Sequence, residues 1–303
     1  MSPLSILSPI LALALSPLLL GVINRTKAVF AGRKGAPLLQ AYFDLWKLLR
    51  KGAVYSRTTS WVFRAGPIVG LAAVLTATLL VPLGNVRAPL AFAGDLILFA
   101  YLFGLMRFVT VLAALDTGSA FEGMGASREV WVSALAEPAL LLGLAVIARL
   151  THSLSLSEMF AGLGVAHWLQ IGPALALVLA AWIVVVLAEN ARIPVDDPNT
   201  HLELTMIHEV MVLDHSGPDL AFIEYGAALK FWVLGTLVVN TLLPLGGGHA
   251  GPSPVVAVAG LFGLAVFVGV VESVMARLRL VVLPQLLVGA GALAAVALIL
   301  VMR

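Results

Sequence analysis

The chain has 303 residues, of which 61% are hydrophobic and only 11% are charged, and its formal net charge is +2. A soluble domain carries about 25% charged residues, so this composition excludes a water-soluble globular protein and a nucleic-acid-binding module. The chain contains no cysteine, which excludes a thiolate-held iron–sulfur cluster, a Cys-ligated nickel–iron centre and disulfides. We therefore expect it to hold no redox cofactor of its own.

Runs of about 20 apolar residues predict transmembrane helices. Eight such runs occur, and they are separated by more polar connections of different lengths. They cover residues 4–23, 66–83, 90–112, 130–150, 168–188, 220–243, 255–273 and 280–302. The predicted fold class is therefore all-α, a polytopic membrane protein of about eight transmembrane helices that forms a single integral membrane domain over residues 1–303.

Basic residues are distributed unevenly between the connections. Thirteen Lys and Arg residues lie in the odd-numbered connections, nine of them in the first (24–65), and three lie on the other side. By the positive-inside rule, the odd-numbered connections face the cytoplasm and both termini face outward. The predicted location is the cytoplasmic (inner) membrane, with cytoplasmic segments at 24–65 and 189–219.

The first connection combines a basic stretch with an amphipathic pattern. Arg25 and Arg33 belong to the basic stretch, and Asp44 and Lys47 lie on the polar stripe of a helix predicted over 38–51. Such a helix lies in the membrane interface. A lipid-surface anchor and a docking site for a partner both fit this pattern.

The fifth connection is acidic although it is predicted to be cytoplasmic. Between 189 and 224 there are eight Asp and Glu residues and one base, Arg192. Pro194 and Pro198 block a helix through this stretch, and Asp197 is a good N-cap for a helix that starts at Pro198. We expect Arg25 and Arg33 of the first connection to neutralise the acidic residues. The acidic residues with a predicted docking or ion-coupling role are Glu189, Asp196, Asp197, Glu203, Glu209, Asp214 and Glu224.

Several ionisable residues lie within the spans themselves. Charges inside a membrane usually face the bundle interior and mark an ion path. We expect Glu137 to form such a path with Glu189 and Glu224, whereas Arg107 and Glu272 are interpreted as members of structural ion pairs, Glu272 with Arg277 close by. Further candidates for ion translocation are Lys230 and the three acids that flank the third connection, Asp116, Glu122 and Glu129.

The histidines give no metal signature. His208-Glu209 is not followed by a second His at the zincin spacing, because position 212 is Val. His201 and His208 share a face of the predicted helix, but two histidines alone are more often hydrogen-bonded than metal-bound. No metal site is predicted.

The acidic connection also contains a family signature. The sequence Glu189-Asn-Ala-Arg192-Ile-Pro194-Val-Asp196 resembles the Glu-x-x-Arg-x-Pro-x-Asp motif of the membrane subunit that joins the two arms of respiratory complex I. Glu203-Leu and Asp214-His-Ser-Gly217 resemble the family's later Glu-Leu and Glu-Tyr-Ser-Gly. The continuation through Asp197-Pro and His208-Glu209 is similar to the branch found in energy-converting, membrane-bound [NiFe] hydrogenases of the hydrogenase-4 and formate hydrogenlyase type.

This resemblance implies a non-catalytic membrane anchor that couples redox chemistry in partner subunits to ion translocation. The implied partners are hydrogenase-like large and small subunits and an iron–sulfur subunit on the cytoplasmic side, antiporter-like membrane subunits, and the lipid bilayer. The partners, rather than this chain, would carry iron–sulfur clusters and a nickel–iron site. Two alternatives are a quinone-chamber subunit of a complex I-type NADH-quinone oxidoreductase, against which the altered loop argues, and an autonomous secondary ion transporter.

Overall fold

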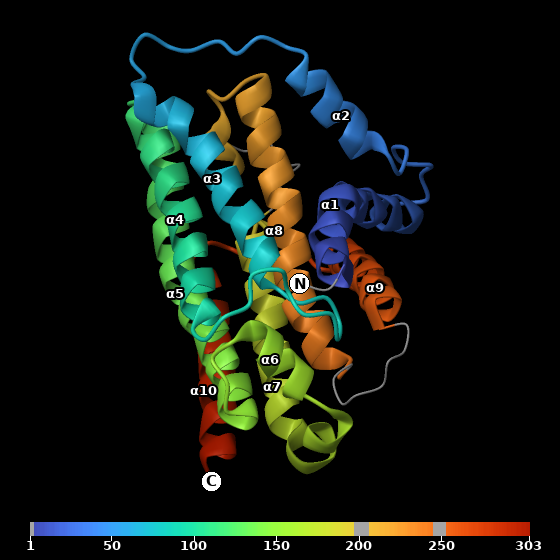
Figure 1. Cartoon of the computed structure of the whole chain (residues 1–303). Helices are drawn as coiled ribbons and strands as arrows, with labels where there is room; N and C mark the ends of the chain where they lie inside the picture. Colours follow the sequence, from blue (N-terminus) through green and yellow to red (C-terminus); the bar gives the residue numbers. More distant parts are fainter. Residues whose placement is uncertain (1–2, 197–205, 245–252) are drawn as a thin grey trace.

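The computed structural model describes residues 3–196, 206–244 and 253–303, and these residues are helical with no strand (Figure 1). Within these ranges, eight helices are long and apolar enough to cross a membrane. Inside lipid every backbone polar group needs an internal partner, which is why apolar runs become helices. The eight are α1 (Pro3–Phe30), α3 (Trp61–Leu80), α4 (Asp95–Asp116), α5 (Ala120–Thr151), α7 (Val165–Glu189), α8 (Pro218–Leu242), α9 (Ser253–Val274) and α10 (Leu283–Met302). The eight predicted spans are thus confirmed.

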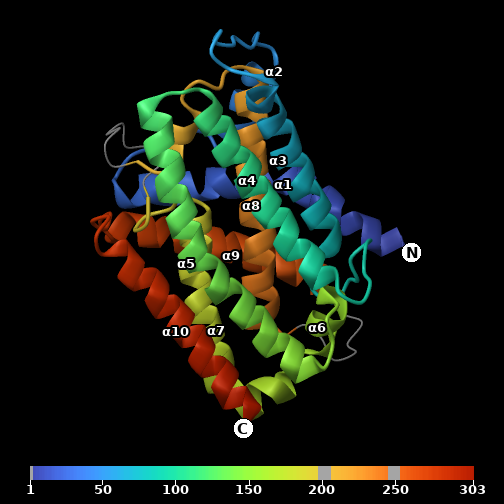
Figure 2. The same cartoon turned by 90° about the vertical axis from the view of Figure 1, so that its left-hand side faces the viewer.

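The spans pack in two groups that share α8. Helices α3, α4, α5, α7 and α10 run side by side, and α1 packs against α9 on the other side of α8 (Figures 1 and 2). Within an apolar stretch of 18 residues, 72% of the residues of α8 are buried, compared with 17% of the residues in the corresponding stretch of α4. Helix α8 is therefore at the centre of the fold, whereas α4 presents most of its surface outward.

Helix α2 (Gln40–Leu49) is the amphipathic helix predicted in the first connection. It lies outside the main bundle, next to α1 and α8 (Figure 1). Gln40 donates from Nε2 to Asp44 Oδ1 at 2.8 Å on the polar stripe, while Phe43 and Trp46 are exposed. The exposed aromatic rings are available to lipid or to a partner.

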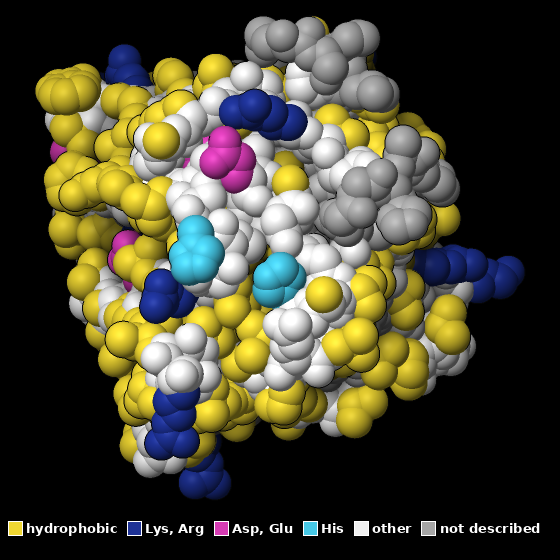
Figure 3. Space-filling model, turned by 60° about the horizontal axis from the view of Figure 1, so that its bottom comes forward, with side chains coloured by type: hydrophobic (Ala, Val, Ile, Leu, Met, Phe, Trp, Pro, Cys, Tyr) yellow, Lys and Arg dark blue, Asp and Glu magenta, His cyan; other side chains and the backbone are white. Residues whose placement is uncertain are grey.

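The two ends of the bundle differ in charge. The basic first connection lies at the end that carries α2, and the short helix α6 (Leu156–Gly162) lies towards the opposite end (Figure 1). On the face in Figure 3, Lys and Arg side chains lie apart from one another among hydrophobic side chains. The concentration of bases in the first connection is the asymmetry on which the predicted orientation depends.

The third connection is shorter than predicted. Helix α5 starts at Ala120 instead of 130, so that Glu122 and Glu129 lie on the helix and only residues 117–119 join it to α4. Gly125, in the first turns of α5, is a site of close packing. A Cβ on Gly125 would lie 2.3 Å from Val210 Cγ1, so glycine lets the fifth connection pack directly on α5.

The prediction of a helix after Asp197 is wrong for the residues of this segment that the structure describes. Residues 197–205, which include Asp197 and Glu203, lie outside the described residues, and beyond them only a short 3-10 helix, η1 (Glu209–Val212), is formed. The N–H groups of Ile207 and His208 donate to Asp196 Oδ2, both at 3.1 Å. The backbone is thus tied to a side chain instead of to its own helical carbonyls.

Candidate functional site: a charge network between the spans

Arg107 lies between two carboxylates in the interior of the bundle. It donates from Nη1 to Glu137 Oε2 at 3.1 Å and from Nη2 to Glu189 Oε1 at 2.8 Å. Lys230 Nζ lies 3.3 Å from the other Glu189 oxygen, Oε2. These four residues, Arg107, Glu137, Glu189 and Lys230, are here called the charge network. It contains two positive and two negative side chains, so its formal charge is zero.

Four different helices supply the charge network. Arg107 lies in the middle of α4, Glu137 precedes Pro138 in α5, Glu189 is the last residue of α7, and Lys230 lies in α8. The side chain of Glu189 is 5% exposed and that of Glu137 is 38% exposed. The network therefore runs from the centre of the bundle to its lateral surface.

A cavity of about 20 Å³ adjoins the network. Its charged and polar lining consists of Arg107, Glu129, Glu189, Lys230, His208 and Thr110. A site of this size holds about one water molecule, and the lining offers the polar partners that a buried water needs. Ser133 donates to Glu129 Oε1 at 3.3 Å, so Glu129, a predicted site residue, lies within the same polar region.

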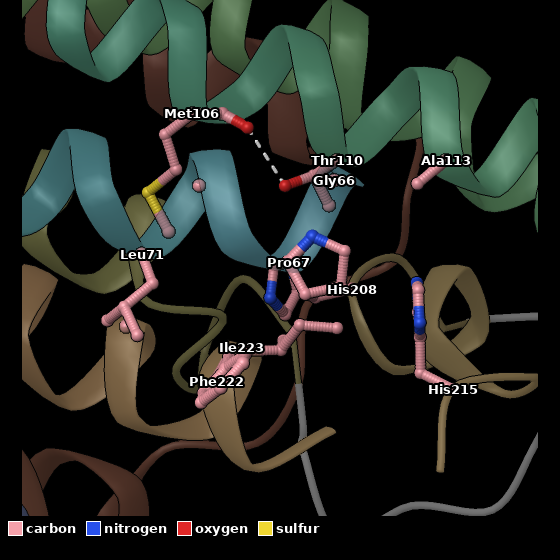
Figure 4. Close-up of a pocket in the computed structure, with 12 residues that line it drawn as sticks. Gly66, Pro67, Leu71, Met106, Thr110, Ala113, His208, His215, Phe222 and Ile223 are labelled. Carbon is pink, nitrogen blue, oxygen red and sulfur yellow. Dashed lines mark hydrogen bonds between the residues drawn. The ribbon is translucent and has the colours of Figure 1, made fainter. Parts of the chain in front are cut away.

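A second cavity of about 20 Å³ shares His208, Met106 and Thr110 with the first. It lies between α3, α4 and the fifth connection, and Figure 4 shows His208 and His215 on the side of the fifth connection. The ring of His215 stacks on Phe63 with centroids 3.9 Å apart and an interplanar angle of 7°. His208 therefore lies next to the charge network, and His215 lines the cavity that adjoins it.

Both histidines are neutral near pH 7. Burial and, to a smaller extent, the nearby Lys230 lower the pKa of His208 to about 4, although Asp196 and Glu189 act in the opposite direction. Burial also lowers the pKa of His215, although Asp219 and Asp214 act in the opposite direction. A neutral imidazole can accept a proton or donate one, and protonation here would add a positive charge close to Lys230.

The motif segment of the fifth connection is held by two groups of charged residues. Asp196 Oδ1 lies 2.8 Å from Arg277 Nη2. Glu272 lies between two bases, 2.7 Å from Lys27 and 3.4 Å from Arg192. Glu272 therefore belongs to an ion-pair group, as predicted. Its partners are Lys27 and Arg192, however, whereas the nearby Arg277 binds Asp196.

The three carboxylates expected to form one path are not together. Glu137 and Glu189 are joined through Arg107, whereas Glu224 lies in a separate pocket of about 140 Å³ between α1, α2 and α8. Asp44 and Gln40 line the same pocket. Helix α2 therefore brings its polar stripe to Glu224, away from the charge network.

Other predicted residues have local structural roles. Asp116 accepts from Ser60 N at 2.7 Å and Phe63 N at 3.2 Å, and so caps the start of α3. Glu122 accepts from Asp214 N at 3.1 Å. Among the described residues, Arg25 and Arg33 make no ion pair with the acidic connection; Arg25 donates to the Lys34 carbonyl instead. The two connections meet elsewhere, for example where Val54 N donates to Ser216 Oγ at 3.1 Å.

Several residues of the site were not among the predicted functional residues. Arg107 and Glu272 were taken only as structural pairs, and Lys27, Arg277 and His208 were given no role in ion coupling. Arg107 carried a signal, because a single base deep in an apolar span requires a buried acidic partner. Within the described ranges, no three His, Asp or Glu side chains lie together in a way that could hold a metal ion.

The fold and the charge network define an integral membrane protein with a polar centre buried between eight spans. The family described as "NADH dehydrogenase" matches residues 3–303, and the chain belongs to this family. The resemblance stated from the motif of the fifth connection is thereby confirmed.

Individual relatives are subunits of membrane oxidoreductase complexes. The chain is 34% identical to formate hydrogenlyase subunit 4 of Escherichia coli over 280 residues, which cover 90% of each chain. It is 33% identical to hydrogenase-4 component C of the same organism, with 78% of this chain and 74% of the relative covered. A chain in the structure of the archaeal membrane-bound sulfane sulfur reductase has the same fold, with a TM-score of 0.82, 20% identity and 98% of both chains covered.

Proposed function

We propose that the chain is a non-catalytic membrane subunit of a hydrogenase-type respiratory complex, in which it couples redox chemistry in partner subunits to proton or sodium translocation. Hydrogenase-like and iron–sulfur subunits dock on the acidic fifth connection, and antiporter-like subunits adjoin the spans. The relatives from formate hydrogenlyase and hydrogenase-4 support this assignment, since the chain matches them over most of its length.

The observation that carries the proposal is the sharing of Arg107 between Glu137 and Glu189. A cation held by two carboxylates has two alternative partners. When Glu189 accepts a proton, its attraction for Arg107 and Lys230 falls, and Arg107 is then held mainly by Glu137. The displacement moves positive charge towards the lateral surface, and loss of the proton reverses it.

The fifth connection transmits events on the partner side to this network. His208 lines the same cavity as Glu189, and its backbone N–H is bound to Asp196. A change of charge in a docked redox subunit acts on Asp196 and His208, and through them on the protonation of Glu189. Each of the two cavities has room for about one water, which favours proton transfer between side chains over quinone binding in them.

The test is Glu189→Gln in the intact complex reconstituted into liposomes. The amide keeps the size of the carboxylate and one of its two acceptor oxygens but cannot take up a proton, so we expect assembly and residual electron transfer with ion uptake reduced at least about tenfold. Glu158→Gln is the control, because Glu158 is 60% exposed and its contact with Arg87 is 3.9 Å long. Full coupled ion uptake in Glu189→Gln would contradict the proposal, and ion flux through the pure chain alone would favour an autonomous transporter.

A further inference from the structure

An apolar groove lies between α7, α8 and α9 on the side of the bundle. Its volume is about 440 Å³, compared with about 20 Å³ for each of the two cavities beside the charge network. The residues that line it are Leu, Ile, Val, Phe and Gly, among them Ile183 of α7, Val238 of α8 and Gly263 of α9. Leu242 and Phe267, which also line it, are 53% and 43% exposed. The groove therefore opens laterally, towards the bilayer that surrounds the spans.

Two glycines of α9 shape the groove. A Cβ on Gly260 would lie 2.7 Å from Val239 Cγ1 and 3.2 Å from Leu243 Cδ1, so α8 and α9 are in direct contact there. A Cβ on Gly263, three residues further along the same helix, would meet nothing within 4 Å. Helical residues three apart share a face, so the open space begins where the contact ends. The groove thus depends on the absence of a side chain at Gly263.

Neither water nor an empty space is a favourable content for this groove. A bound water needs about two to four polar partners, whereas the lining residues have apolar side chains. An empty groove would deprive these side chains of contacts on one side. Inside a bilayer, the apolar groups that can fill it belong either to a helix of another protein or to a lipid chain.

The size of the groove favours a lipid chain over a helix. An α-helix with its side chains has a diameter of about 10 Å and a pitch of about 5.4 Å, so one turn occupies roughly 420 Å³. The groove would hold about one such turn, although its lining extends over about two turns of α9, from Gly260 to Phe267. At about 30 Å³ for a group the size of a water molecule, the same volume holds roughly 15 methylene-sized groups. A long and narrow space of this volume fits one fatty acyl chain.

An indole ring marks the end of the groove nearest to the membrane surface. Trp168, near the start of α7, donates from Nε1 to the Thr241 carbonyl oxygen at 3.0 Å. Thr241 directly precedes Leu242 and Leu243, which line the groove where α8 ends. Tryptophan is enriched at the headgroup level of membranes. A chain in the groove would therefore start at the headgroup level and extend towards Phe267 in the middle of the span.

We infer that the groove between α7, α8 and α9 binds one acyl chain of a membrane phospholipid, whose headgroup lies at the level of Trp168. Three helices surround this chain, so it gives up more contacts on leaving than a lipid on a convex surface of the bundle. It should therefore remain bound when other lipids exchange. The inference goes beyond the proposed function, because the lining residues are outside the charge network and ion coupling is not required.

A phospholipid that carries a photoreactive diazirine at the end of one acyl chain tests the site. The intact complex is reconstituted with this lipid, washed with detergent and irradiated, and the adducts are mapped by mass spectrometry. We expect adducts on Ile183 and Phe267 to survive the washing, whereas adducts on Val288 of α10, 56% exposed, should disappear. Loss of both sets of adducts at the same rate would overturn the inference, as would labelling by a diazirine fatty acid but not by the phospholipid.

A pair of glycine substitutions tests the groove itself. Gly263→Leu fills the open space and should lower the retained labelling about tenfold, as expected when an added side chain overfills a packed site. Gly289→Leu on α10, where a Cβ also meets nothing within 4 Å, is the control and should leave the labelling within about twofold. Unchanged electron transfer in both variants shows that the complex is assembled.

Equal labelling of the two glycine variants would overturn the inference. A photo-crosslinking amino acid at Phe267 separates the remaining occupants: it should link to lipid, and a link to a transmembrane helix of another subunit or of a second copy of this chain would also overturn the inference. These yields do not depend on ion uptake, so the acyl-chain site can stand even if Glu189→Gln remains fully coupled.

Discussion

Arg277, in the connection between α9 and α10, lies 2.8 Å from Asp196, the last acid of the motif in the fifth connection. A second bond acts beside it, from Leu278 N to the Pro194 carbonyl oxygen at 2.9 Å. Asp196 in turn accepts the N–H groups of Ile207 and His208. The C-terminal part of the chain therefore fixes the position of the motif and of the histidine beside the charge network.

We predict that Arg277→Gln destabilises the protein by about 3 kcal/mol, because removal of one partner leaves the buried Asp196 carboxylate without its ion pair. Thermal unfolding of the purified chain in detergent measures the change. Arg279→Gln is the matched control, because Arg279 is exposed two residues away, and it should unfold at the temperature of the unsubstituted protein. Equal unfolding temperatures for the two variants would show that the Arg277–Asp196 pair contributes nothing.

Asp116 provides a prediction that separates a structural role from ion translocation. Because it caps α3 through Ser60 and Phe63, Asp116→Ala should cost about 1–2 kcal/mol of unfolding free energy. Asp116→Asn keeps an oxygen acceptor and should lose less, with ion uptake by the reconstituted complex unchanged. Uncoupling by Asp116→Asn at normal stability would instead restore Asp116 to the ion path.

Stability should decrease in acid because of the buried histidines. The pKa of His208 is about 4 in the folded chain and about 6.5 when unfolded, so between these values the unfolded state binds the proton more readily. Its contribution is complete above pH 6.5, is lost progressively as the pH falls to about 4, and amounts to about 3 kcal/mol.

Unfolding free energies measured between pH 7.5 and 4 test this dependence. His208→Gln should flatten the curve, whereas His152→Asn, at an exposed position with positive φ that Asn tolerates, should not. A curve for His208→Gln as steep as that of the unsubstituted protein would assign the acid sensitivity to other groups.

Hydropathy was sufficient to predict the eight spans and the amphipathic helix, because both are properties of contiguous sequence. The partners of the intramembrane charges were not predictable in the same way. Arg107 is 30 residues from Glu137 and 82 from Glu189, and which faces of α4, α5 and α7 meet depends on how the helices are rotated against one another. The sequence therefore indicated that Arg107 needs a partner without indicating which one.

The predicted residues that lie apart from the charge network do so for a common physical reason. Asp116 and Glu122 were grouped with the ion-path residues because both are acids near a membrane end, yet their carboxylates accept backbone N–H groups. Glu224 was grouped with Glu189 because the two flank one connection, but α2 and α1 form a separate pocket around it. An acidic residue near the end of a span can either accept backbone N–H groups or take part in ion translocation. Its position in the sequence does not tell which, because the donors that it binds come from distant segments.

The contact between Gly143 and Trp182 gives a test of the packing that supports the network. A Cβ on Gly143 would lie 2.2 Å from Trp182 Nε1, and Trp182 is 1% exposed and donates from Nε1 to the Leu140 carbonyl oxygen at 3.3 Å. Gly143→Ala should therefore displace the indole ring, separate α5 from α7 and cost about 1–3 kcal/mol of unfolding free energy.

Gly289→Ala on α10 is the control for this substitution, because a Cβ there meets nothing within 4 Å, and alanine should be neutral or slightly stabilising in the helix. Since α5 and α7 carry Glu137 and Glu189, Gly143→Ala should also lower ion uptake more than electron transfer in the reconstituted complex. If Gly143→Ala and Gly289→Ala unfold at the same temperature with the same coupling, the α5–α7 contact would be adaptable, and the distance between the two carboxylates would not depend on it.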